Sequence, residues 1–125
     1  MSPWILVAVG GALGSVARYG LGQAVDARWG GDFPVGTLLI NLVGSFAIGL
    51  VAGFAPDAAL RQLVMIGVLG GFTTFSSFSL QTVQLMSAGR YPAAAGYVAA
   101  SVVLCLLGTM LGLALAKACG GRAVL

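Results

Sequence analysis

The middle of this chain reads Gly70-Gly71-Phe72-Thr73-Thr74-Phe75-Ser76-Ser77-Phe78-Ser79. The stretch lies within an uncharged run, Gln62–Gly89, which is longer than the roughly 20 residues that a helix needs to cross the hydrocarbon core of a bilayer. Paired glycines followed by five hydroxyl residues within seven positions disfavour a continuous helix. We therefore predict a transmembrane helix that is broken at membrane depth, where freed backbone groups need a cavity, another chain or an ion as partner.

Uncharged runs of similar length flank this stretch on both sides. Phe33–Pro56 and Tyr91–Ala116 carry no charge, and the first run, Met1–Ala17, is followed by Arg18 and more apolar residues. A secretory signal peptide is the alternative for the first run, but no basic region precedes it. The sequence thus predicts a single domain, residues 1–125, with four transmembrane helices at about Trp4–Leu21, Val35–Phe54, Arg61–Ser87 and Ala93–Ala116.

The composition excludes several classes of protein. Of 125 residues, 59% are hydrophobic and only 7% are charged, against roughly 25% in an ordinary soluble domain. There is no histidine or glutamate, so an enzyme that relies on acid–base chemistry is not expected. The six cationic residues are scattered, which argues against nucleic-acid binding. Cys105 and Cys119 have no metal-binding spacing and are not expected to pair.

The basic residues give no clear membrane orientation. Arg61, Lys117 and Arg122 fall on one predicted side, while Arg28, Arg90 and Arg18 (near the predicted end of the first helix) fall on the other. Three cations against three leave the positive-inside rule undecided. Either the chain inserts both ways, so that two opposite copies can pair as an antiparallel dimer, or one arginine outweighs the others and fixes the topology.

Polar residues line one face of two other predicted helices, because residues spaced by four share a helix face. They are Thr37, Asn41 and Ser45 in the second helix and Tyr97, Ser101 and Cys105 in the fourth. An unsatisfied amide in hydrocarbon is costly, so Asn41 needs a partner. That partner is either a neighbouring helix, through a simple interhelical hydrogen bond, or an ion.

The residues of the predicted break suit small ions of both signs. Freed carbonyls that face a second copy of themselves could hold a small cation. Phe75 and Phe78 are three positions apart and can direct the positive edges of their rings to nearly the same side. Ring edges together with hydroxyl and amide donors suit an anion. The alternative is that both phenylalanines belong to the core or face lipid.

Three segments resemble the small fluoride channels of the CrcB or Fluc family. They are GGALGSVARY at positions 10–19, GTLLINLVGSF at positions 36–46 and GGFTTFSSF at positions 70–78. Length, helix layout and motif order also agree. The resemblance implies an all-α membrane protein that forms an antiparallel, dual-topology homodimer with two fluoride pores.

The resemblance also implies roles for particular residues. One structural sodium ion is expected at the dimer centre, held by the backbone carbonyls of Gly70 and Thr73 of each chain. The expected pore residues are Asn41, Phe75 and Phe78, with Ser77, Tyr97 and Ser101 along a polar track. Cys105 continues this track with a thiol, which is a weaker donor than a hydroxyl. Arg18 matches a family arginine near the pore mouth, where it either attracts anions or holds a helix end.

The function implied is passive export of cytoplasmic fluoride across the bacterial inner membrane, with fluoride, lipid and a second copy as partners. The predicted pore residues include no acidic or basic side chain, so proton-coupled antiport has no obvious carrier. A small multidrug-type, dual-topology transporter is one alternative, but such proteins use a membrane glutamate that this chain lacks. A non-conducting membrane subunit, whose residues only pack, is the other.

Overall fold

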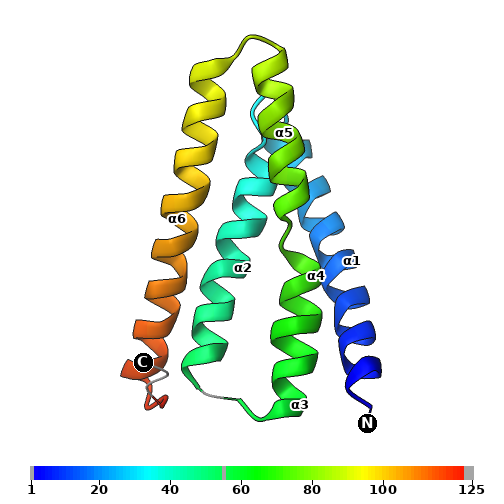
Figure 1. The fold of residues 1–125 in the computed structure, drawn as a ribbon, viewed down its shortest axis with the longest axis vertical. Coiled ribbons are helices and arrows are strands. Elements are labelled where there is room, and N and C mark those ends of the chain that lie inside the picture. The colour runs from blue at the N-terminus through cyan, green and yellow to red at the C-terminus, as the bar shows by residue number, and fades with distance from the viewer. Residues whose placement is uncertain (1, 55, 123–125) are drawn as a thin grey trace.

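The computed structural model describes residues 2–54 and 56–122, and these form a bundle of long helices (Figure 1). Three of its spans are continuous helices, and one is divided into shorter segments. In chain order the elements are α1 (Pro3–Trp29), α2 (Val35–Gly53), α3 (Ala58–Leu60), the π-helix η1 (Arg61–Leu69), α4 (Gly70–Phe72), α5 (Phe75–Ser87) and α6 (Tyr91–Ala118).

Four helical stretches in the described residues are long and apolar enough to cross a membrane. They are Pro3–Trp29, Val35–Gly53, Ala58–Ser87 and Tyr91–Ala118, with mean hydropathies of 1.4, 2.1, 1.6 and 2.4. The third stretch is interrupted between α4 and α5, where the ribbon leaves the helical path (Figure 1). The prediction of an all-α protein with four membrane-spanning helices and a broken third helix is therefore confirmed.

The predicted end of the first helix at Leu21 is wrong. Helix α1 continues through Asp26 and Arg28 and ends at Trp29, immediately before the pair Gly30-Gly31. Gly22 follows Leu21 directly, but a single glycine is tolerated within a helix and no proline comes before Gly30-Gly31, so neither Gly22 nor the polar side chains stop the helix. As a result, Arg18 lies in the interior of α1 rather than near its end.

Successive spans run in opposite directions between the two ends of the bundle. The start of α1, the link from α2 to α3 and the end of α6 lie at one end of the bundle, and the hairpin between α5 and α6 lies at the other (Figure 1). This arrangement agrees with the predicted grouping of Arg61 and Lys117 on one side.

Glycines set the distances between helices. A side-chain carbon added at Gly49 of α2 would collide with the backbone carbonyl of Thr109 on α6, and one added at Gly112 would collide with that of Phe46. On the other side of the bundle, Gly10 of α1 lies against Gly67 of η1 in the same way. Backbones therefore touch directly, as small residues allow in lipid. Helix α2 therefore packs closely on α6, and the first half of the broken span, η1, packs closely on α1.

Few side chains are buried among the described residues, and one cluster of them forms a core near the α5–α6 hairpin. Leu85, Ala94 and Tyr97 form this core, and Phe33 and Phe78 pack against it. Most other large apolar side chains point outward, for example Trp4, which is 84% exposed. An outward apolar surface suits lipid or another copy of the chain. The core lies beside the broken helix and supports its second half.

Candidate functional site

The break in the third span consists of two residues in extended conformation. Thr73 has φ −78° and ψ 158°, and Thr74 has φ −150° and ψ 114°. The Thr74 side chain then starts α5, because its Oγ1 accepts a hydrogen bond from the Ser77 backbone N–H at 3.2 Å. Threonine is a preferred N-cap residue for this reason. The hydroxyl that disfavours a continuous helix thus begins the next one.

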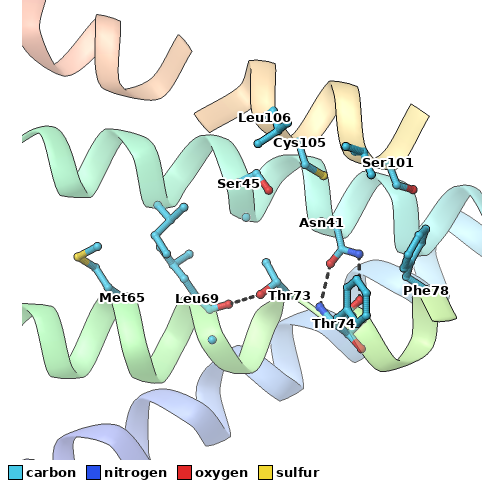
Figure 2. Close-up of a pocket in the computed structure, with 15 residues that line it drawn as sticks. Asn41, Ser45, Met65, Leu69, Thr73, Thr74, Phe78, Ser101, Cys105 and Leu106 are labelled. Carbon is cyan, nitrogen blue, oxygen red and sulfur yellow. Dashed lines mark hydrogen bonds between the residues drawn. The ribbon is translucent and has the colours of Figure 1, made fainter. Parts of the chain in front are cut away.

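Asn41 of α2 holds the break from the side. Its Oδ1 accepts a hydrogen bond from the Thr74 backbone N–H at 2.8 Å, and its Nδ2 donates to the Thr74 carbonyl at 3.0 Å (Figure 2). A primary amide has two N–H donors, and this pair of bonds uses one of them. The interhelical hydrogen bond considered for Asn41 is therefore present, and a second N–H is left for another acceptor.

Side chains take over the donors that two backbone carbonyls would use in a continuous helix. The Gly70 carbonyl would accept from the Thr74 N–H, which instead bonds to Asn41. The Thr73 carbonyl would accept from the Ser77 N–H, which instead bonds to the Thr74 side chain. The Thr73 carbonyl receives a bond of 3.4 Å from Nη1 of Arg18. Gly70 is exposed.

The two halves of the span bring opposite partial charges to the break. The last turn of α4 ends in carbonyls, which form the negative end of a helix dipole, and the first turn of α5 begins with N–H groups at a positive end. Discontinuous membrane helices use such ends to bind ions of either sign. The geometry can therefore serve a cation on the α4 side and an anion on the α5 side.

A cavity of about 500 Å³ opens beside the break, between α2, η1, α5 and α6 (Figure 2). It brings together six of the nine predicted site residues, namely Asn41, Gly70, Thr73, Phe75, Phe78 and Ser101. Several other lining residues are aliphatic, and among the residues that the structure describes no carboxylate, lysine or arginine lines the cavity.

Three aromatic rings connect this cavity to the core. The rings of Phe75 and Phe78 have centroids 5.3 Å apart, and those of Phe78 and Tyr97 are 5.2 Å apart. Phe75 is 78% exposed, whereas Tyr97 is fully buried and donates from its hydroxyl to Oε1 of Gln81 at 2.9 Å. Tyr97 therefore lies behind Phe78 and does not line the cavity wall. Ser77 does not line it either and instead bonds to Thr74.

The fourth span presents two polar side chains to the cavity. Ser101 is 7% exposed, and its hydroxyl has no hydrogen-bond partner among the described residues. Cys105, one turn further along α6, also lines the cavity. A buried hydroxyl without a partner is uncommon. Ser101 can therefore donate to a guest in the cavity at no cost to an existing bond.

A second, more polar cavity of about 570 Å³ lies at the α5–α6 end of the bundle. Gln81 and Gln84 line it together with Asp32 and Arg90, which form an ion pair at 3.5 Å. Gln81 contacts this outer cavity and also accepts the Tyr97 hydrogen bond. Gln81 and Tyr97 thus lie between the outer cavity and the Phe78 ring, which lines the inner one.

The family described as CrcB-like protein, Camphor Resistance (CrcB) matches residues 5–113 of the chain. The chain belongs to this family. A protein of Opitutus terrae named fluoride-specific ion channel FluC is 50% identical over 119 residues, which cover 90% of each chain. Relatives with the same name occur in Rhodospirillum centenum (48% identity, 90% of this chain and 94% of the relative) and Magnetococcus marinus (47%, 89% and 94%).

Family membership agrees with the character of the four spans. The helices are long and apolar enough to cross a bilayer, and the relatives are named as ion channels of bacteria. The chain is therefore a multi-pass bacterial membrane protein.

Two residues of this CrcB-like site have roles that sequence analysis missed. Thr74 is both the N-cap of α5 and the backbone partner of Asn41. Its place directly before a helical run is the signal that could have shown the cap. Gln81 bonds to Tyr97 across two helices. No spacing within one helix reveals such a contact.

Proposed function

We propose that this chain is a fluoride-selective channel that passively exports cytoplasmic fluoride through two pores per antiparallel dimer. The observation that carries the proposal is the shared name of relatives that are 47–50% identical over about nine-tenths of the chain, fluoride-specific ion channel. Ion channels are not enzymes, in agreement with the function class expected from the composition.

The chemistry of the cavity supports an anion as the conducted species. Moving a bare ion from water into hydrocarbon costs tens of kcal/mol on a Born estimate, so donors fixed in place must replace water. The cavity offers the second N–H of Asn41 and the unpartnered hydroxyl of Ser101. The ring edges of Phe75 and Phe78 add positive partial charge. Donor groups on short side chains that lie close together suit a very small anion.

Passive flow is the mechanism that this lining supports. A coupled antiporter needs a group that binds and releases a proton within the membrane. The described part of the chain places no carboxylate, lysine or arginine in the cavity wall, and the whole sequence has no histidine. Fluoride then moves down its own gradient, which leads outward when fluoride accumulates in the cytoplasm.

A structural sodium ion fits the carbonyls on the α4 side of the break. In a continuous helix the Gly70 and Thr73 carbonyls would each accept a backbone N–H that side chains now bind. Four such neutral oxygens, two from each copy, would suit a hard monovalent cation without any carboxylate. The described residues contain no cluster of three or more His, Cys, Asp and Glu. The sodium would hold the two copies together at their breaks.

The second copy supplies the missing wall of the cavity. Gly70 and Phe75 line the cavity yet are exposed in one copy, so the cavity lacks cover beside the break. We expect an antiparallel homodimer, because the basic residues give no orientation bias. Epitope tags on the carboxyl terminus, probed in intact and in permeabilised cells, should be accessible from both sides of the membrane. Tags that all face one side would exclude the antiparallel arrangement.

Fluoride efflux from liposomes tests the proposed function itself. Purified protein in vesicles loaded with potassium fluoride should release fluoride once valinomycin allows the charge to balance, and a fluoride electrode measures this release. Vesicles loaded with potassium chloride serve as the matched control and should release little chloride. A protein that passes neither ion would be a non-conducting subunit. Equal passage of both would contradict fluoride selectivity.

A further inference from the structure

Arg18 brings a positive charge to the helix break. Its guanidinium donates to the Thr73 carbonyl at 3.4 Å, a contact between α1 and one of the two residues that separate α4 from α5. Arg18 is half-buried. Charged side chains inside a membrane span are costly and are by default a sign of function.

No acidic side chain balances this charge in the described part of the chain. The one ion pair found there joins Arg90 to Asp32 at the α5–α6 end of the bundle. The Thr73 carbonyl is a neutral dipole, and it has lost its helical N–H partner to the Thr74 side chain. The guanidinium therefore stabilises an oxygen that would otherwise lack a donor, and that oxygen partly solvates the guanidinium.

We infer that Arg18 is a built-in competitor of the sodium ion for the Thr73 carbonyl, and that it sets the affinity of the sodium site. The inference rests on the proposed function, in which this carbonyl is a sodium ligand. A carbonyl oxygen has two lone pairs, so geometry does not forbid both partners. Two positive charges on one oxygen nevertheless repel each other, and the repulsion is large where the effective dielectric constant is low.

This competition has two consequences of opposite sign. Without sodium, Arg18 keeps the break intact by satisfying the Thr73 carbonyl. With sodium, the same charge weakens binding of the ion, which makes the site exchangeable instead of permanently filled. If Arg18 had a purely structural role, replacing it would lower stability equally at every sodium concentration. If Arg18 competes with sodium, the loss of stability on replacing Arg18 should depend on the sodium concentration.

The test measures sodium binding to the purified full-length protein in detergent. Thermal unfolding is followed while sodium replaces N-methylglucamine at constant ionic strength, because a ligand that binds only the folded state raises its stability by RT ln(1 + [L]/Kd), a rise from which the dissociation constant Kd is fitted. For Arg18→Gln we expect the fitted sodium dissociation constant to be about tenfold lower than in the parent. We also expect lower stability than the parent without sodium and a difference that closes as sodium is added.

Two further variants separate charge from shape. Arg18→Lys keeps the charge but loses the planar fork, and it should keep the weak sodium affinity of the parent. Arg28→Gln removes an equal charge from the last turn of the same helix, far from the break, and should leave sodium affinity unchanged. An Arg18→Gln variant that binds sodium with the parent's affinity, or more weakly, overturns the inference.

A measurement on the parent covers the case in which Arg18→Gln does not fold. In protein labelled with ¹⁵N-arginine, the Arg18 side-chain signal, assigned by its loss in Arg18→Lys, should shift over the range in which sodium saturates. A signal that stays fixed while radioactive sodium binds refutes the competition and leaves the sodium site in place. If neither the parent nor Arg18→Gln retains radioactive sodium, the sodium site of the proposed function has failed, and this inference fails with it.

Discussion

Fluoride efflux is expected to fall about 100-fold or more when Asn41 is replaced by aspartate, which corresponds to roughly 3 kcal/mol of added barrier. Asn41 donates to the Thr74 carbonyl at 3.0 Å and accepts from the Thr74 N–H at 2.8 Å. An ionised carboxylate can only accept, so one of its oxygens would face the Thr74 carbonyl and repel it. The same negative charge would repel an anion in the adjoining cavity.

Fluoride efflux from liposomes and the oligomeric state in detergent are the two measurements for this variant. Ser45→Ala is the control, because Ser45 lines the same cavity one turn further along α2 and no hydrogen bond of its side chain holds the break. Asn41→Ala separates the two causes: it removes both bonds to Thr74 but adds no charge, and it should retain more flux than Asn41→Asp. Parent-like flux through a folded Asn41→Asp dimer would remove Asn41 from the conduction path.

The break shows how far the sequence alone reaches. A glycine pair followed by hydroxyl residues predicted the interruption, because these residues compete with a helical backbone. The position of the interruption, at Thr73 and Thr74, depends on Asn41 from a different helix. Local propensity indicates that the helix is weak here. The long-range hydrogen bond from the Thr74 N–H to Asn41 determines where the helix is interrupted.

Helix ends were predicted less well than helix number. Uncharged runs identified four spans, since charge is costly in hydrocarbon. The same reasoning ended the first helix too early, at Leu21, although α1 continues to Trp29. Charged residues such as Asp26 and Arg28 do not end a helix, so α1 extends beyond the apolar run. Only Gly30-Gly31 supplies a true stop.

The candidate site was predictable where one helix face sufficed. Ser101 and Cys105 share a face of α6 and line the cavity together, as their spacing indicated. Tyr97 shares that face but lies behind Phe78, because α5 packs against the end of α6 that carries it. The tilt between two helices determines such contacts, and the spacing of residues within one helix does not predict that tilt. The pore roles of Tyr97 and Ser77 stay predictions.

Replacing either Phe75 or Phe78 by isoleucine is expected to lower fluoride flux by at least about tenfold while the dimer stays intact, equivalent to roughly 1.4 kcal/mol of barrier. Isoleucine keeps most of the bulk but has no ring edge with positive partial charge to face an anion. Phe75 is 78% exposed in one copy, so its replacement should change the stability of that copy's fold by less than about 0.5 kcal/mol. A loss of flux in Phe75→Ile therefore reports on the path and not on unfolding.

Phe72→Ile provides the matched control for both variants. Phe72 belongs to the same segment but packs beside Gly44 of α2 and does not line the cavity. Phe78 also stacks on Tyr97 at 5.2 Å, so Phe78→Ile should cost about 1 kcal/mol of folding stability in addition to flux. The comparison uses liposome efflux for conduction and thermal unfolding in detergent for packing. If Phe72→Ile lowers flux as much as Phe75→Ile, the effect comes from disturbing the broken helix and ring edges do not line the fluoride path.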